Sequence, residues 1–506
     1  MLKQSIKTIQ FVKKFKKYKS AKGEIEREKA AHYVADFIKQ EGGLFLKVAQ
    51  YLGTNSKTSK AIQDLSTIEN NGIELEDIKL IISVELKQSC SDIFESIDQN
   101  AFTASVGQVH KAKLISGESV AVKVQYPLIE KTLKDQMKLL KLIPTGKAEK
   151  KWGVDIGEYQ RMIQKLLAEE LDYSKEMSKQ LEVYNKIKKS SYIKVPKVYK
   201  DLSTKKILIT EFLDGECIRD IDLWSIQEKK KLSESIVFSF LELLKNGYLQ
   251  ADTNHGNFIF LKNEKQIKVG IIDFGQFTSF SERYVKALFS LINNLIAEEE
   301  VDYFSYLVEL GFDGEKLKHI QKSLPLLSKV IFEPFTENSS FNLNSWNYKK
   351  KIELILGEDK WWFRSAGGED FFLLLKSFMG FKNLIQKLNG RVNWQQIFLE
   401  SIVDIKEELK LYTPKKVFGI EAEFTGFSTK LIVNVLENNK PKINIVMPIK
   451  AIFDLDEIID NEILVKLIEK NIDINKLVID ALKNGAKAQT LFSLKDLDKQ
   501  YSISIE

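Results

Sequence analysis

The chain has 506 residues, of which 44% are apolar and 29% are charged, and this composition excludes a globally disordered chain and a fibre. The 76 basic and 70 acidic residues leave a net charge of only +6, so the overall charge gives no case for a nucleic-acid partner. The two cysteines and four histidines are scattered, which argues against a disulfide scaffold and a zinc site.

The N-terminus shows no secretory signal pattern, and no apolar run reaches the roughly 18 residues that cross a bilayer. We therefore expect a cytoplasmic protein without a transmembrane helix, with any membrane contact peripheral at the inner face. The first 22 residues carry eight lysines and no acidic residue, with apolar residues at helical spacing. This pattern fits an interfacial helix, but a solvated terminus that frays is the favoured interpretation.

Residues 24 to about 53 read as a helix that Gly42 and Gly43 interrupt. From about 92 to 126 the pattern changes to β-branched alternation around a Ser-Gly turn, which predicts a hairpin. A helix is expected from about 154 to 189, followed by two strands between 192 and 215. Together these elements predict a small sheet with a helix inserted between its strands.

A helix is expected from Gly215 to about residue 248, followed by the polar turn ADTNHGN and two apolar strands, Phe258 to Leu261 and Lys268 to Ile272. Residues 281 to about 412 read as mainly helical. After Thr413 a hairpin pattern, helices and a terminal alternating segment indicate a separate small α+β domain.

Lys123 lies between valines on a predicted strand, where an ammonium group is costly to bury unless an anion meets it. Taken alone, such a lysine is more often a surface residue on an edge strand. The preceding strand, however, begins at a turn of small residues, Ser105 to Gln108, whose backbone amides can face phosphates. Glu176, on the following helix, is a candidate carboxylate to orient the lysine.

Two further constellations follow along the chain. Asp252 and Asn257 lie five residues apart in a turn before a strand, and a later strand ends in Asp273-Phe274-Gly275. Each is unremarkable by itself, and such a loop is usually only a turn. Their order after the strand lysine and the helix glutamate indicates a two-lobed kinase.

Phosphoryl transfer accounts for these residue types. Asp273 and Asn257 supply the oxygen ligands that Mg²⁺ prefers, and Lys123 offsets phosphate charge. Asp252 is expected to orient the attacking hydroxyl or water. In the order of kinase motifs, the strand that leads into Gly215 has the position of the hinge between the two lobes. Glu211 and Leu213 would bind an adenine there through their main chain.

Six segments resemble the UbiB/AarF/ADCK atypical kinase-like family: KVAQ (47–50), TASVGQVHKA (103–112), VAVKVQYP (120–127), EELDYSKE (169–176), QADTNHGN (250–257) and IIDFG (271–275). The resemblance implies a protein-kinase-like fold with an N-terminal helical extension folded over the active site. It also implies ATP or ADP and Mg²⁺ as ligands, and a link to coenzyme Q and other isoprenoid lipid metabolism.

The resemblance assigns further residues to the nucleotide site. The extension motif falls on Lys47 and Gln50, with Ala49 where the family has glycine, and the Glu-x-Asp motif falls on Glu170 and Asp172. The family's alanine-rich loop falls on Ala104, Ser105, Val106, Gly107 and Gln108. Two other departures from the family are Lys179, where an asparagine is usual, and Thr253, where the catalytic loop usually has proline.

We therefore predict an α+β chain with a bilobal protein-kinase-like fold, an N-terminal helical extension and a small C-terminal α+β domain. The expected domains are 1–90 for the extension, 91–215 for the kinase-like N-lobe, 216–412 for the helical C-lobe and 413–506 for the C-terminal domain.

The expected function is that of an atypical kinase-like phosphotransferase or ATPase acting in quinone or isoprenoid lipid metabolism. Its expected partners are a nucleotide and a component of that pathway. The alternative is a non-catalytic, nucleotide-gated scaffold that binds lipid or protein. An ordinary Ser/Thr kinase fits poorly, because the sequence has neither a Gly-x-Gly-x-x-Gly loop nor a His-Arg-Asp triplet.

Overall fold

A computed structural model describes residues 72–103, 106–127, 129–130, 171–263, 266–417 and 428–506 except 429, 439, 471, 484 and 497, together with residues 26, 28, 29 and 32. The basic N-terminal stretch, most of the helix predicted over 24–53 and the first part of the helix predicted over 154–189 lie outside these residues. The described chain forms two compact units: one contains the residues up to Leu223 with Asp252–Phe277, and the other contains Trp224–Ala251 with Thr278–Glu506.

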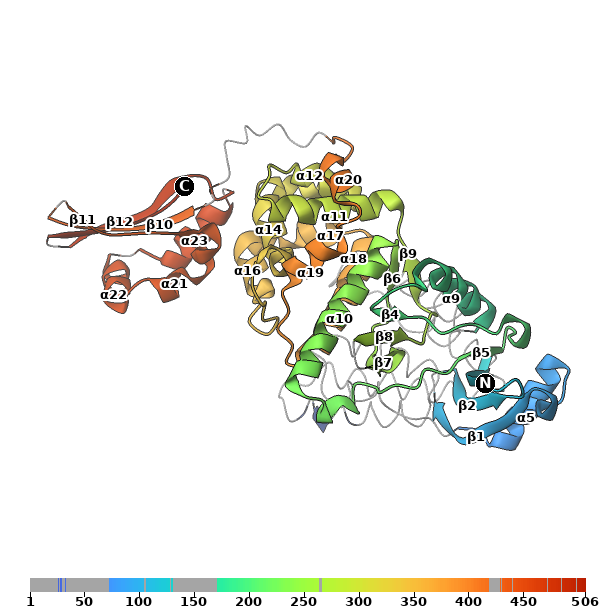
Figure 1. Cartoon of the computed structure of the whole chain (residues 1–506). Coiled ribbons are helices and arrows are strands. Elements are labelled where there is room, and N and C mark those ends of the chain that lie inside the picture. Colours follow the sequence, from blue (N-terminus) through green and yellow to red (C-terminus); the bar gives the residue numbers. More distant parts are fainter. Residues whose placement is uncertain are drawn as a thin grey trace. The chain divides into compact units, whose positions relative to one another are not determined.

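The first unit is built on a four-stranded antiparallel sheet in the order β1-β2-β3-β5 (Figure 1). Its strands are β1 (Phe94–Thr103), β2 (Gly107–Leu114), β3 (Ser119–Gln125) and β5 (Ile207–Glu211). The predicted hairpin is thus confirmed as β2 and β3, and Gly117 in their turn has a φ of +98°, a conformation that favours glycine.

Each face of this sheet is covered by one helix. On one face Val120, Val122 and Val124 are fully buried in a core that includes Ile78 and Ile82 of α5 (Leu75–Leu86). On the other face, Leu208 packs with Tyr173 of α9 (Tyr173–Ile187). Because side chains alternate along a strand, Lys123 points to the α9 side.

A second sheet in the same unit has the order β4-β8-β7 and consists of β4 (Ile193–Lys194), β7 (Phe258–Lys262) and β8 (Ile267–Ile271). The strands β7 and β8 confirm the two strands predicted there. The prediction that both strands between 192 and 215 join the same small sheet is wrong for the first strand, β4, which joins this second sheet. Its two residues pair in parallel with β8, where the Val269 amide donates to the Tyr192 carbonyl at 2.8 Å.

The second unit begins with α10 (Ile226–Lys245), whose N-terminus is closed by a capping box between Ser225 and Glu228. The predicted helical region follows as α11 (Glu282–Ile296), α12 (Tyr303–Glu309), α13 (Gly314–Leu317), α14 (Leu324–Ile331), α15 (Glu333–Thr336), α16 (Tyr348–Leu356), α17 (Lys360–Ala366), α18 (Glu369–Lys387), α19 (Trp394–Ser401) and α20 (Lys406–Leu411). Two short strands, β6 (Tyr248–Gln250) and β9 (Phe277–Ser279), also pair. In the part of the chain that the structure describes, no helix combines the length and the apolar character that a bilayer span requires.

The C-terminal region is an antiparallel sheet in the order β11-β10-β13-β12, with helices α21 (Leu455–Ile458), α22 (Asn461–Glu469) and α23 (Ile474–Lys483) between its two hairpins. Its strands are β10 (Lys430–Glu437), β11 (Lys440–Pro448), β12 (Gln489–Asp496) and β13 (Lys499–Ile505). The sequence missed β12, because a bulge between Thr490 and Phe492 leaves the neighbours Leu491 and Phe492 both buried and breaks the alternation.

Gly107, at the start of β2, lies where a side chain does not fit. A Cβ atom built there lies 2.2 Å from the Val124 carbonyl oxygen and 2.9 Å from the Tyr173 hydroxyl oxygen. We expect Gly107→Ala to lower the free energy of unfolding by about 1–3 kcal/mol, because the strands must separate. Urea unfolding followed by circular dichroism measures this.

Gly256 provides the matched control, since a Cβ atom there has its nearest neighbour at 3.9 Å. Gly256→Ala should leave the unfolding midpoint close to that of the wild type. Equal midpoints for the two variants would show that β2 and β3 do not approach as closely as described.

Candidate functional site

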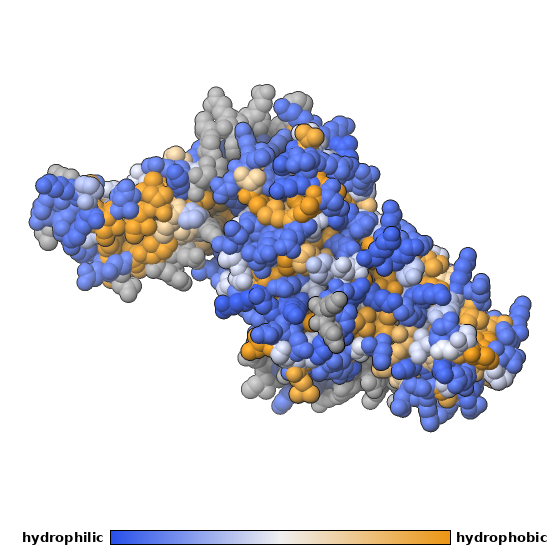
Figure 2. Space-filling view, in the orientation of Figure 1, coloured by the Kyte–Doolittle hydropathy of each residue, from blue (hydrophilic) through white to orange (hydrophobic). Residues whose placement is uncertain are grey.

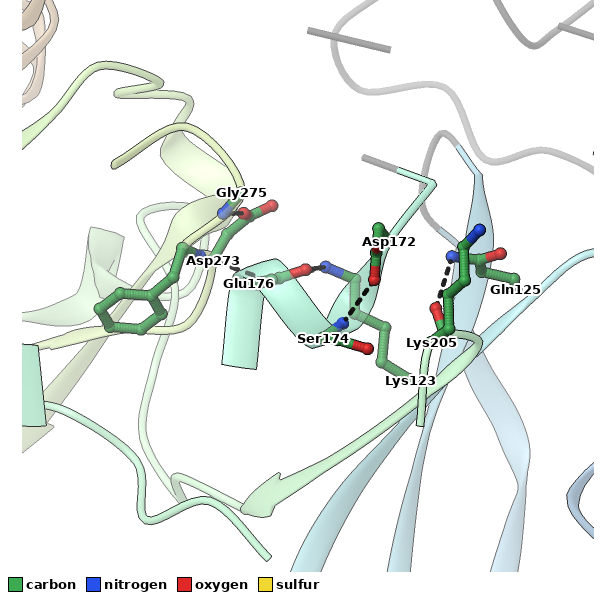
Figure 3. A network of polar contacts seen from close by, with 9 residues as sticks. Lys123, Gln125, Asp172, Ser174, Glu176, Lys205, Asp273 and Gly275 are labelled. Carbon is green, nitrogen blue, oxygen red and sulfur yellow. Dashed lines mark hydrogen bonds and ion pairs between the residues drawn. The ribbon is translucent and has the colours of Figure 1, made fainter. Parts of the chain in front are cut away.

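Lys123 and Glu176 form a buried ion pair between β3 and α9. The Lys123 ammonium donates to both carboxylate oxygens of Glu176, at 2.9 Å to Oε1 and 2.8 Å to Oε2 (Figure 3). The side chains are only 16% and 4% exposed, respectively. The structure thus confirms that the strand lysine meets a helix carboxylate, which is the partner that its burial requires.

The charges of this pair are coupled to Asp273. Burial by itself lowers the pKa of Lys123, but the negative charges of Glu176 and Asp273 outweigh it and the pKa is raised. Burial raises the pKa of Glu176, and the Lys123 ammonium opposes that rise. The lysine therefore stays protonated although it is buried.

The helix that carries Glu176 is anchored at its first turn. Asp172 is its N-cap, and its carboxylate accepts a hydrogen bond from the Ser174 amide at 3.1 Å. The next residue, Tyr173, lies with its ring 4.9 Å from the Lys123 ammonium, as a cation–π contact. The sequence reasoning missed Tyr173, although an aromatic residue three positions before Glu176 on a helix lies on the same face.

Glu176 also reaches the segment Asp273-Phe274-Gly275. The Phe274 amide donates to Glu176 Oε1 at 3.4 Å, and the Phe274 ring, 2% exposed, stacks on Phe277 at 4.7 Å between ring centroids. In Figure 3 Asp273 lies beside Glu176, on the side away from β3. One carboxylate thus connects the strand lysine to this segment.

The loop of Asp252 and Asn257 is held together by its own side chains. The Asn257 side-chain amide donates to the Asp252 carbonyl at 3.0 Å, and the Asn254 carboxamide oxygen accepts from the Gly256 amide at 3.2 Å. The Ile272 amide donates to the Asn257 carbonyl at 3.1 Å. This last bond places Asn257 beside the strand end that carries Asp273.

Asp273 and Asn257 are chemically suited to a magnesium ion. Both offer oxygen donors, and Mg²⁺ is usually held by one or two carboxylates while phosphates and water complete its coordination. One carboxylate oxygen of Asp273 accepts from the Gly275 amide at 2.8 Å, which fixes the orientation of the side chain.

The predicted hinge residues lie at the end of β5. The Glu211 carboxylate forms an ion pair with Lys194 at 2.6 Å and accepts from the Lys197 amide at 3.1 Å. Leu213 is 8% exposed and approaches Gly270. The Leu213 side chain therefore packs against β8, the strand that leads to Asp273.

Gln108 has a structural contact that the sequence did not indicate. Its carboxamide accepts from the Ile73 amide at 2.9 Å and donates to the Ile73 carbonyl at 3.0 Å. It also contacts Nε2 of His110 at 2.8 Å, and Nδ1 of that histidine contacts the Asp98 carbonyl at 2.8 Å. These buried contacts attach the chain that precedes α5 to β2, so the side chain of Gln108 is directed at Ile73.

The structure therefore brings Lys123, Glu176 and Asp273 together, with Asp252 and Asn257 on the adjoining loop. Val106 is buried against Tyr173, and Gly107 follows it at the start of β2. Lys47, Gln50, Ala104, Ser105 and Glu170 lie outside the described residues. The assignment of all these residues to nucleotide binding stays a prediction.

Comparison with known proteins gives a match between residues 69–305 and the ABC1 atypical kinase-like domain. The AarF domain-containing kinase 1 of Drosophila melanogaster is 25% identical over 309 residues, which are 59% of this chain and 59% of that protein. The atypical kinase COQ8 of Saccharomyces cerevisiae, a mitochondrial protein, is 24% identical over 377 residues, covering 71% of this chain and 73% of the relative. The resemblance to the UbiB/AarF/ADCK family is thereby confirmed.

The chain spans only about 60% of the length of some of these relatives, such as the Drosophila protein and a Dictyostelium discoideum protein. Among solved structures, the Rv3197–erythromycin complex from Mycobacterium tuberculosis matches with a TM-score of 0.49 and 18% identity, covering 74% of this chain and 96% of that one.

Replacing Glu176 by glutamine tests the buried ion pair. Glu176→Gln keeps the shape of the side chain but leaves the Lys123 ammonium buried without its carboxylate, so we expect the free energy of unfolding to fall by about 3 kcal/mol. The exposed pair of Lys179 and Glu182 on the same helix serves as control, and Glu182→Gln should cost no more than about 1 kcal/mol. Denaturant titration compares the two, and equal losses would contradict the burial of the first pair.

Proposed function

Because residues 69–305 match the ABC1 atypical kinase-like domain, we propose that this chain binds ATP with Mg²⁺ and uses it for phosphoryl transfer, in support of quinone or isoprenoid lipid metabolism. The observation that carries the proposal is the contact of one buried carboxylate, Glu176, with both Lys123 and the Phe274 amide. That arrangement holds the Lys123 ammonium, on β3, near the Asp273 carboxylate, just beyond the end of β8.

Each residue has a role in this proposal. Lys123, held charged by Glu176, binds phosphate oxygens. Asp273 and Asn257 hold the magnesium ion, which neutralises phosphate charge when it is bound. Asp252 positions the hydroxyl or water whose oxygen forms the new bond to the γ-phosphorus, and accepts its proton as ADP leaves with the β–γ bridging oxygen.

The class of acceptor rests on the family resemblance. The resemblance implies that the extension motif, here Lys47 and Gln50, and the Glu-x-Asp motif, here Glu170 and Asp172, gather above the phosphates. If they do so here, they occupy the space where a peptide would lie, which disfavours phosphorylation of other proteins. Water or a small lipid-pathway molecule then remains as the acceptor.

A nucleotide-gated scaffold without turnover is the second candidate. Thr253, in place of the usual proline beside Asp252, and Ala49, in place of the usual glycine, favour it. The retained Asp252, Asn257 and Asp273 favour the enzyme.

Nucleotide binding is tested by thermal unfolding. ATP at millimolar concentration with Mg²⁺ should raise the melting temperature by several degrees, because a ligand that binds only the folded state stabilises it. The chelator EDTA should cancel the rise, and Asp273→Asn should remove it. Asp201→Asn, at an exposed carboxylate in the same unit, should keep it. A melting curve that ATP leaves unchanged in the wild type would refute the proposal.

Turnover is tested separately by phosphate release with and without anionic vesicles. Asp252→Ala should keep the nucleotide-dependent rise in melting temperature but slow phosphate release by about 100-fold or more. Binding without release in the wild type, or release that is the same in Asp252→Ala, would favour the scaffold over the enzyme.

A further inference from the structure

The sheet of the C-terminal domain is covered unevenly on its apolar face. One row of paired residues runs across it from Phe492 through Ile503 and Val433 to Ile445. Phe492 and Ile503 are 6% and 2% exposed, whereas Ile445, on β11, is 47% exposed. The row is therefore buried at β12 and β13 and exposed to solvent at β11.

The neighbouring row shows the same gradient. It runs from Leu494 through Tyr501 and Val435 to Ile443, and the exposed fraction is 1% for Leu494, 8% for Val435 and 42% for Ile443. Across the two rows, Phe492, Leu494, Ile503 and Val435 are buried, whereas Ile443 and Ile445 on β11 are exposed. Figure 2 shows hydrophobic surface gathered on this domain.

β11 is also an edge strand. Among the strands that the structure describes, it is hydrogen-bonded only to β10, so alternate backbone N–H and C=O groups point outward from the sheet. Lys440, Pro441 and Lys442 protect its beginning in the usual manner of edges, but the segment INIVM that follows has no charge and no proline. An uncovered apolar row and an open backbone edge thus coincide on one strand.

We propose that β11 pairs antiparallel with β11 of a second copy of this chain, about a two-fold axis at Asn444. The strand runs from Lys440 to Pro448, so Asn444 is its midpoint and full overlap of the two strands centres on it. That register places Ile443 of one copy opposite Ile445 of the other on the same face. The apolar rows of the two sheets then continue into each other, and the outward backbone groups around Asn444 gain partners.

The opposite face and the charges fit the same register. A polar row crosses that face through Ser493, Ser502, Asn434 and Asn444, and the axis places the Asn444 side chains of the two copies together, where their amides can pair. Lys442 comes opposite Val446 and Lys440 opposite Pro448, so no lysine faces a lysine. A lipid surface would cover the isoleucines but would leave the backbone edge without partners, which is why a second copy is the better occupant.

Light scattering on the full chain tests the proposal. The wild type should have twice the mass of one chain at high concentration and dissociate on dilution. The double variant Ile443→Lys with Ile445→Lys should stay monomeric, with the melting temperature that the wild type shows when it is dilute and monomeric. Ser493→Lys, on the opposite edge strand β12, should dimerise like the wild type. A wild type that is monomeric at every concentration would overturn the proposal.

A cross-linking variant tests the register without depending on the lysine variants. Asn444→Cys should be joined to its copy by a short bis-maleimide, whereas Ser493→Cys should give only the background of Cys90 and Cys217. A dimer that forms without this cross-link, and persists in the lysine variant, would place the interface elsewhere. Sedimentation of a monomeric wild type with anionic vesicles, lost in the lysine variant, would assign the face to lipid and also overturn the proposal.

Discussion

The ion pair of Lys123 and Glu176 is the constraint on which the described site depends. Removing two charges from water costs free energy, and an apolar pair of the same size at the same place often gives an equally or more stable protein. The ion pair is therefore poorly explained as a source of stability. Once one partner is buried, however, the other must be present and correctly placed. This requirement fixes α9 against β3, and Asp172 and Tyr173 at the first turn of α9 supply the cap and the ring that hold it there.

The same carboxylate extends this constraint to the third segment of the site. The contact of Glu176 with the Phe274 amide positions the turn after β8, and the hydrogen bond from Ile272 to the Asn257 carbonyl brings the preceding loop beside it. The Lys123–Glu176 pair, the contact of the Glu176 side chain with Phe274 and the main-chain bond of Ile272 thus join segments that are remote in sequence. The proposed phosphoryl transfer depends on these contacts, because they place the Asp273 carboxylate near the Lys123 ammonium.

The sequence predicted the elements of the proposed site because each has a local pattern. Valines alternate with Lys123 on β3, an apolar strand follows the polar loop of Asp252 and Asn257, and a second apolar strand leads into Asp273. The sequence-based prediction failed where the pairing of strands determines the structure. β4 pairs with β8 although the chain that follows β4 leads to β5. β12 carries a bulge that interrupts the alternation of buried and exposed residues. Gln108 is similar, because its partner Ile73 lies 35 residues away and no local pattern points to it.

By itself, the sequence determined the kinase-like order of motifs, the residue types suited to phosphate and magnesium, and the helical and β-rich regions, because these depend on residue identity and local periodicity. Only the tertiary structure decided which face of the sheet Lys123 occupies, which backbone amide Glu176 meets and which strand of the C-terminal sheet is left uncovered. Those features arise from contacts between segments far apart in the chain. There the burial of one polar or apolar group determines which partner from a distant segment must lie against it.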